Sequence, residues 1–325
     1  MNLAQRLLTG TAFCLAEAVA SAQGVWPAKA LHIIVPFPAG GQTDMAARII
    51  GRAMSESLKT PVVVENKAGA HGFIGAGEAA RAPADGYTLM VGSTGLLAIN
   101  PALYERIPYN VNRDFAPVSL LMTVPIVIMA NTRTLPVAGV RELIAYAKAN
   151  PGKVNFASAG NGGSSHLVAE YLSYRTGVSM THIPYKGEAP ATADVVSGQV
   201  DLMFNTLVSS IPHLDSGKVR ILATTTRSRL SEFPDVPTVA EALHLNDFEA
   251  SSWAALYVPA ATPPEIVRRL SSEADAALKS PEVSRRLKEL GAVPVGGTPE
   301  ALATFQRAEQ KKWANVVKAA GIKPD

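Results

Sequence analysis

Short apolar runs rich in β-branched residues alternate along this chain with longer stretches of helical pattern, and this alternation limits the folds open to it. The strand-like runs are Leu31–Phe37, Val62–Glu65, Tyr87–Val91, Pro125–Ala130, Val154–Ser158, Thr181–Tyr185, Leu202–Asn205, Arg220–Thr225 and Trp253–Val258. Helix-like stretches such as Thr43–Leu58, Arg141–Ala149 and Ser165–Thr176 lie between them. Strands that alternate with helices are typical of parallel sheets covered by helices, so the sequence predicts an α/β fold.

The C-terminal part departs from this alternation, because from Pro264 to Ala320 it is mostly helical. No linker rich in Gly, Pro or Ser divides the chain once, and a single cut would leave this helical tail without a sheet to cover. We therefore expect the tail to pack back on the first sheet, so that the chain crosses between two lobes twice, near residues 122–126 and 247–253. Two lobes with two crossings form a hinge and a cleft, the usual place for a small ligand.

The composition excludes several classes of protein. With 47% hydrophobic and 18% charged residues in 325, the chain has enough apolar material for a core and is not disordered. The net charge is only +3 and the basic residues are scattered, which argues against nucleic-acid binding. One cysteine excludes a disulfide framework, and the six histidines show no pair at metal-ligand spacing. We expect no cofactor and no metal ion.

The first residues have the pattern of an export signal. Arg6 precedes an apolar stretch from Leu7 to Ala20, and Ala20-Ser21-Ala22 is a small-x-small cleavage pattern. The stretch is shorter than the roughly 20 residues that span a bilayer. The alternative is an N-terminal helix that frays. The predicted division is an export signal in residues 1–22, a first lobe in 23–123 with 251–325, and a second lobe in 124–250.

Two glycine-rich turns, Val35–Asp44 and Ala157–His166, each run from a predicted strand into a predicted helix. Glycine lets the backbone approach a ligand closely, and the first N–H groups of the following helix are unpaired and partly positive. Each turn is therefore a plausible seat for a carboxylate or phosphate. One turn falls in each predicted lobe, which suits a ligand with two carboxylates. The alternative is that both turns only cap helices.

Single residues near these turns allow two readings. Asp44 is suited to complement the helix dipole or to orient a ligand. Phe37 is suited to a pocket wall or to the core, and His166 to a structural hydrogen bond or to ligand contact. Gly75–Ala80 fits G-x-G-x-x-A but does not directly follow a strand, so a dinucleotide site is not expected there. Lys186 lies in a Pro-Tyr-Lys-Gly setting that indicates a turn rather than a catalytic lysine.

A set of motifs covering essentially the whole mature chain resembles the Bug family, the substrate-binding proteins of tripartite tricarboxylate transporters. The motifs are Ile34–Gly41 with Asp44, Val62–Lys67 with Gly69, Pro83–Leu89, His182–Gly187, Gly198–Phe204, Phe233–Thr238 and Trp253. The resemblance implies a periplasmic binding protein of the type II, Venus-flytrap form, with two α/β lobes that close over a small organic anion. Carried over by position, the ligand contacts would be Phe37, Pro38, Ala39, Gly40, Gly41, Asp44, Ser93 and Thr94 in the first lobe. In the second lobe they would be Ala159, Gly160, Asn161, Gly163, Ser164, Ser165, His166, Asp201, Phe204 and Asn205.

The function expected from the turns and the resemblance is capture of a small carboxylate in the periplasm and its delivery to transporter subunits in the membrane. We expect a monomer that is not an enzyme and does not bind nucleic acid. A periplasmic sensor subunit needs the same closing clamp, and an exported enzyme acting on a carboxylic acid is a further alternative. A serine nucleophile at Ser93, Ser158 or Ser164 would need a base that the sequence does not place. Dicarboxylates, citrate-like acids, aromatic acids, amino acids and nicotinate-like acids all remain open as ligands.

Overall fold

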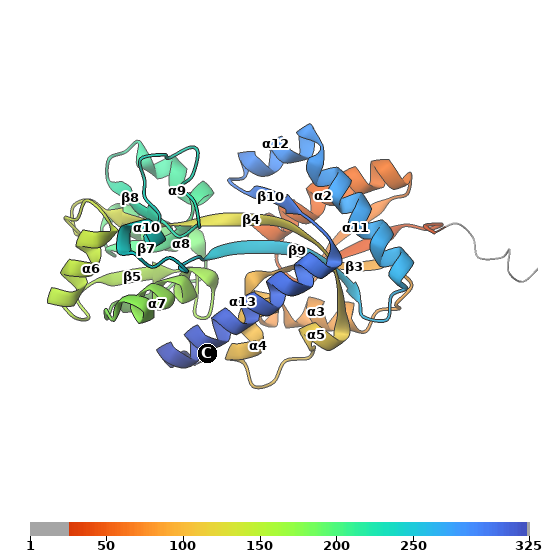
Figure 1. Cartoon of the computed structure of the whole chain (residues 1–325), viewed down its shortest axis with the longest axis horizontal. Helices are drawn as coiled ribbons and strands as arrows, with labels where there is room; N and C mark the ends of the chain where they lie inside the picture. The colour runs from red at the N-terminus through yellow and green to blue at the C-terminus, as the bar shows by residue number, and fades with distance from the viewer. Residues whose placement is uncertain (1–25, 324–325) are drawn as a thin grey trace, which may run out of the picture.

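The protein has two lobes that lie along its long axis, with two long strands running between them (Figure 1). The computed structural model describes residues 26–323, so the predicted export signal in residues 1–22 lies outside the described part. The two long strands are β4, Phe115–Asn131, and β9, Ser251–Pro259, which pair antiparallel with each other. The predicted α/β fold with two lobes and two crossings is therefore confirmed, and both crossings are strands of a sheet.

The first lobe is built around β4, β9 and three parallel strands, in the order β2-β1-β3-β9-β4. Its elements before the crossing are β1 (Leu31–Val35), α2 (Gln42–Leu58), β2 (Val62–Asn66), η1 (Ala70–Gly72), α3 (Phe73–Ala80), β3 (Thr88–Ser93), η2 (Gly95–Ile99), α4 (Asn100–Leu103) and α5 (Val111–Asp114). After β9 follow α11 (Pro264–Lys279), α12 (Pro281–Glu289), β10 (Val293–Gly296) and α13 (Pro299–Ala320).

The second lobe continues the same sheet from β4 in the order β4-β7-β5-β6, with β8 also paired to β4. Its elements are α6 (Val140–Ala149), β5 (Asn155–Ser158), α7 (Ser164–Thr176), β6 (Thr181–Pro184), α8 (Glu188–Ser197), β7 (Leu202–Thr206), α9 (Leu207–Leu214), β8 (Val219–Thr224) and α10 (Val239–Leu243). Pro125, which has no N–H to donate, lies where β4 changes its partner from β9 to β7 and β8.

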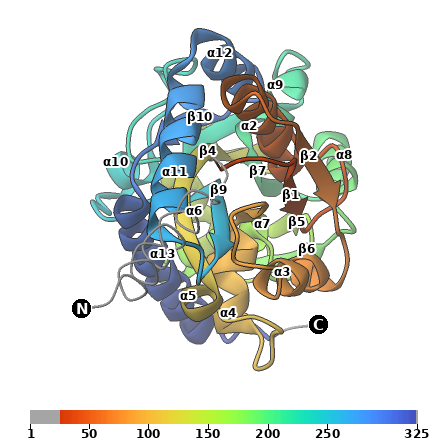
Figure 2. The same cartoon turned by 90° about the vertical axis from the view of Figure 1, so that its right-hand side faces the viewer.

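The core forms on both faces of the sheet, because successive side chains along a strand point to opposite faces. In β1, Leu31, Ile33 and Val35 pack with α2, α11 and α12, whereas Ile34 packs with α3 on the other face. The view in Figure 2 shows α2, α11 and α12 on one side of the first lobe and α3 on another. Because both faces of β1 are covered, its sequence is apolar except for His32, as is typical of a strand that is buried on both faces.

Two expectations about the sheet are wrong. Parallel pairing holds for β1 with β2 and β3, and for β5 with β6 and β7, but β4, β8, β9 and β10 pair antiparallel. The two lobes also share one continuous sheet instead of having a sheet each. The reason is topological: β4 leaves the first lobe and β9 returns to it, so the two crossing strands run in opposite directions.

The helical C-terminal part packs only partly as expected. The helices α11, α12 and α13 each have a proline at the first helical position, Pro264, Pro281 and Pro299. The first two helices pack on the first lobe, but α13 contacts α7 of the second lobe as well as η2 and β4. Its buried Glu309 accepts hydrogen bonds from the indole N–H groups of Trp253, on β9, and of Trp313, each at 3.0 Å.

Candidate functional site

The first glycine-rich turn joins β1 to α2 and is held in shape from behind by Asp44. The Asp44 carboxylate accepts hydrogen bonds from the Gly40 N–H at 2.9 Å, from Arg48 Nε at 3.0 Å and from Asn66 Nδ2 at 2.9 Å. Asn66 Nδ2 also donates to the Phe37 carbonyl at 3.0 Å. Gly40 has φ +88°, a conformation that favours glycine, and no side chain caps the start of α2.

The second glycine-rich turn joins β5 to α7 and is held by residues of its own loop and helix. The Ala159 N–H donates to Ser165 Oγ at 3.0 Å, and the Gly162 N–H donates to His166 Nδ1 at 3.1 Å. The His166 ring stacks on His182 with 3.8 Å between the ring centres, which fixes the imidazole against the sheet. No side chain caps the start of α7 either, so its first N–H groups are left for water or a ligand.

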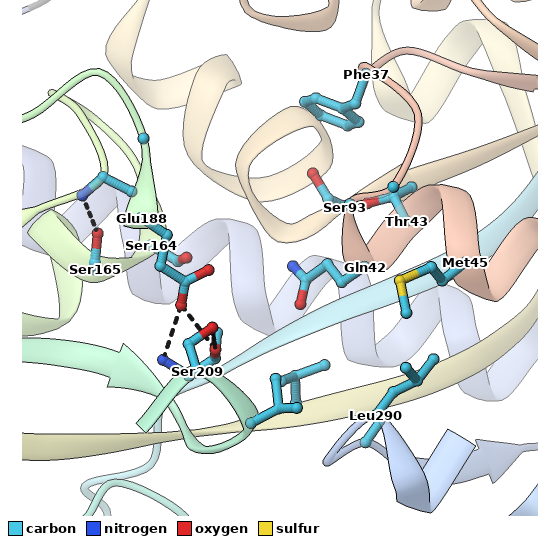
Figure 3. Close-up of a pocket in the computed structure, with 18 of the residues that line it drawn as sticks. Phe37, Gln42, Thr43, Met45, Ser93, Ser164, Ser165, Glu188, Ser209 and Leu290 are labelled. Atoms are coloured by element: carbon cyan, nitrogen blue, oxygen red, sulfur yellow. Dashed lines mark hydrogen bonds between the residues drawn. The ribbon is translucent and has the colours of Figure 1, made fainter. Parts of the chain in front are cut away.

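Both turns face one cavity of about 730 Å³ between the lobes, and Figure 3 shows Phe37 and Gln42 on one side of it with Ser164 and Glu188 on the other. A second hollow of about 360 Å³ shares Phe37, Gln42, Ser93, Ala159 and Ser164 with it. The size suits a small organic molecule. The two turns thus lie on opposite walls of a shared space, as a clamp on one ligand requires.

Most of the residues expected at the site line one of these two hollows. Those on the larger cavity are Phe37, Pro38, Ala39, Gly40, Gly41, Ser93, Ala159, Ser164, Ser165 and Phe204. Gly160, Asn161 and Gly163 line the smaller one.

Five expected residues line neither hollow and have structural partners instead. Asp44 holds the first turn and His166 holds the second. Thr94 Oγ1 accepts from the Trp253 N–H at 2.8 Å, which ties the end of β3 to β9. Asp201 accepts from the Asn155 N–H at 2.8 Å, and the buried Asn205 donates to Thr192 Oγ1 at 3.2 Å.

Two further strand-to-helix turns lie on the second-lobe wall. Sequence reasoning recognised the turn at Pro184–Gly187 without placing it at the site, and it missed the turn that follows β7. Gly187 and Glu188 follow β6 and begin α8, while Thr206 ends β7 and Ser209 lies in the first turn of α9. The run Thr181–Tyr185 followed by glycine carried the same signal as the two recognised turns. Gln42 and Thr43 lie in the recognised turn Val35–Asp44, and Met203 lies in the motif Gly198–Phe204. The other lining residues carried no local signal and come from distant parts of the chain: Met45, Met122, Val124, Ile126, Val208, Leu290 and Ala292.

The electrostatics of the cavity come from the backbone. Four helices, α2, α7, α8 and α9, begin at its walls, and no side chain in residues 26–323 accepts a hydrogen bond from their first-turn N–H groups. Among the described residues that line the larger cavity there is no Lys, Arg or His, and Glu188 is the one charged side chain. Among the described residues that line this cavity, the positive potential for an anion therefore comes from helix N-termini.

Acidification is expected to weaken the first turn through Asp44. Burial opposes ionisation, but hydrogen bonds from Arg48, the Gly40 N–H and Asn66 outweigh it and hold the pKa of Asp44 below its ordinary value of 3.8. Because the pKa is lower in the folded state, this stabilisation is complete above about pH 4 and is lost as the pH falls through the folded value. We expect Asp44→Asn to lower the free energy of unfolding by about 1–3 kcal/mol at pH 6.

The measurement is urea unfolding of the wild type and Asp44→Asn between pH 2 and pH 6. The difference between the two proteins should shrink as the pH falls below about 4, because the unfolded wild type then binds a proton at Asp44 that the folded carboxylate does not bind. A difference that stays constant down to pH 2 would show that the ionised carboxylate does not hold the turn.

No group of three or more His, Cys, Asp or Glu side chains in residues 26–323 is arranged to hold a metal ion. Within the same range, every helix is too short or too polar to cross a membrane.

Comparison with known proteins identifies the same family as the sequence motifs. The model of the "Tripartite tricarboxylate transporter family receptor" matches residues 46–322. Rpa4515 of Rhodopseudomonas palustris, solved with adipate, is 38% identical with a TM-score of 0.80, covering 92% of this chain and 100% of that chain.

Two further solved structures have the same fold. The periplasmic binding protein BugD is 36% identical with a TM-score of 0.76, covering 92% of this chain and 100% of that chain. MatC (Rpa3494) of Rhodopseudomonas palustris, with bound malate, is 34% identical with a TM-score of 0.76, covering 90% of this chain and 100% of that chain.

Proposed function

Because this chain belongs to the tripartite tricarboxylate transporter receptor family, we propose that it captures a small carboxylate in the periplasm and delivers it to the membrane subunits of a tripartite transporter. The observation that carries this proposal is the pair of glycine-rich turns on opposite walls of one cavity. In the proposal, residues 1–22 are the cleaved export signal and the mature chain acts as a monomer.

The first lobe of the proposed clamp comprises residues 23–123 with 251–325, and the second comprises residues 124–250. An anion first meets the N–H groups at the start of α2 and α7, which lack a capping side chain. Closure of the lobes then adds contacts from the opposite wall and removes water, which strengthens each hydrogen bond to the anion. The ligand shifts the lobes toward the closed form by its higher affinity for that form.

No bond of the ligand is made or broken in this proposal. The described residues include a serine and a histidine in contact, Ser158 Oγ and His182 Nε2 at 2.6 Å, which is the pairing of a nucleophile with a base. Ser158 is fully buried and lines neither hollow, so a ligand in the cavity does not meet it. Ser165, which does line the cavity, uses its Oγ to accept from the loop N–H of Ala159.

Thermal unfolding of the purified protein with succinate, glutarate, adipate, malate and citrate tests the proposed function. A ligand at 100 times its dissociation constant stabilises the folded state by about 2.7 kcal/mol, which raises the unfolding temperature. The neutral diamide of adipate is the control and should have no effect. If none of the small acids, nor any amino acid, raises the unfolding temperature, carboxylate capture is wrong. Recovery of the bound acid as a new product would instead support an enzyme.

A further inference from the structure

Glu188 places a negative charge in a cavity that has no cationic side chain among its described lining residues. It is the first residue of α8, directly after Gly187. One of its carboxylate oxygens, Oε1, accepts from Thr206 Oγ1 at 2.7 Å and from the Thr206 N–H at 3.3 Å. Within residues 26–323, no Lys, Arg or His forms an ion pair with it. Figure 3 shows the carboxylate on the cavity side of its chain, across the space from Gln42.

Two acceptor atoms on opposite walls of the cavity have no hydrogen-bond donor among the described residues. Glu188 Oε2 has no donor among the described residues, and the buried Gln42 Oε1 has none either. When the lobes close and water leaves, an ionised carboxylate needs a cation or a strong donor, because removing an unpaired charge from water is costly. A second ligand carboxylate at this position would add repulsion between like charges.

We propose that the ligand carries an ammonium group as well as a carboxylate, so that it is an amino acid rather than a dicarboxylate. The ligand carboxylate binds at the starts of α2 and α7, and the ammonium group binds Glu188. This assignment rests on the proposed function and narrows its substrate class. Glu188 acts as the residue that determines specificity, since it attracts a cation and rejects a second anion at the same end of the cavity.

Calorimetry on matched ligands tests the assignment. The panel contains α-amino acids, 4-aminobutanoate and 5-aminopentanoate, together with glutarate and adipate, which have the same numbers of methylenes as the two ω-amino acids. We expect the wild type to bind an amino acid at least about 30-fold more tightly than any dicarboxylate of the panel. In Glu188→Gln, which keeps a carbonyl acceptor for Thr206, the amino acid should bind about 30-fold more weakly and the dicarboxylates more tightly than in the wild type.

Glu265→Gln is the matched control, because it also removes an acidic side chain from the first turn of a helix, α11, but lies outside both hollows. It should leave every affinity unchanged. A wild type that prefers a dicarboxylate or a hydroxy acid, or an amino-acid affinity that survives Glu188→Gln, overturns the assignment and leaves carboxylate capture intact. If neither the amino acids nor the dicarboxylates bind the wild type, the proposed function itself is wrong.

Discussion

Replacing Gly40 with valine is expected to weaken binding of the carboxylate ligand by about 100-fold or more while the protein stays folded. Gly40 lines the cavity, its N–H is held by Asp44, and an added Cβ would meet no protein atom within 4 Å. The valine side chain therefore enters open cavity space instead of clashing with the protein. It occupies the place where a ligand carboxylate approaches the backbone, and its strain at φ +88° disturbs the neighbouring N–H groups.

Gly177→Val is the control that distinguishes the loss of ligand contacts at Gly40 from the effect of backbone strain alone. Gly177 has φ +67° at the C-terminal end of α7, and a Cβ there also meets nothing within 4 Å, but the residue lines neither hollow. Both variants should lose about 1–3 kcal/mol of stability, because valine tolerates a positive φ poorly. Only Gly40→Val should lose binding in a calorimetric titration with the ligand found by the thermal screen. Equal affinities in the two folded variants would place the ligand site elsewhere.

Replacing Glu309 with alanine is expected to lower the free energy of unfolding by about 3–5 kcal/mol. The Glu309 carboxylate is the acceptor for two buried indole N–H groups, on Trp253 and Trp313, and forms an ion pair with Lys312. Truncation leaves both indole groups buried without an acceptor, at a cost of about 1–3 kcal/mol each. It also removes the polar link between the crossing strand β9 and the helix α13 that contacts both lobes.

Urea unfolding followed by tryptophan fluorescence measures this loss. Glu309→Gln should lose less than Glu309→Ala, because a carbonyl oxygen remains for the indole groups. Asn315→Ala, at an exposed position of the same helix, is the control and should change stability by less than about 0.5 kcal/mol. Equal effects of Glu309→Ala and Asn315→Ala would mean that the indole groups find other acceptors.

Strands with a clear local sequence pattern could be predicted, and the two strand segments that were missed contain proline. Each of the nine strand-like runs overlaps a strand, but the first half of β4, with Pro117, and the short β10, with Pro294, were missed. Proline inside an apolar run argues against a central strand, since it cannot donate to the ladder. Here two shifts in the pairing of β4 with β9, next to Pro117 and beyond Leu120, let the pair accommodate it.

The parts of the site that are marked by a short continuous stretch of sequence could be predicted. A strand, glycines and a helix in sequence mark a backbone seat, and most residues of both turns do line the hollows. The sequence did not show whether polar side chains beside the turns, such as Asp44 and His166, contact the ligand or hold the turn in shape. The answer depends on the direction in which each side chain points. Leu290 and Ala292 reach the cavity from the loop between α12 and β10, a long-range arrangement that no local pattern encodes.

The pairing of β4 with β9 from Phe115 to Pro125 has a mechanical consequence. Two strands joined by a ladder of backbone hydrogen bonds cannot slide past one another. In the proposed clamp, the lobes would therefore close by bending and twisting this pair of strands, without any shift in its register.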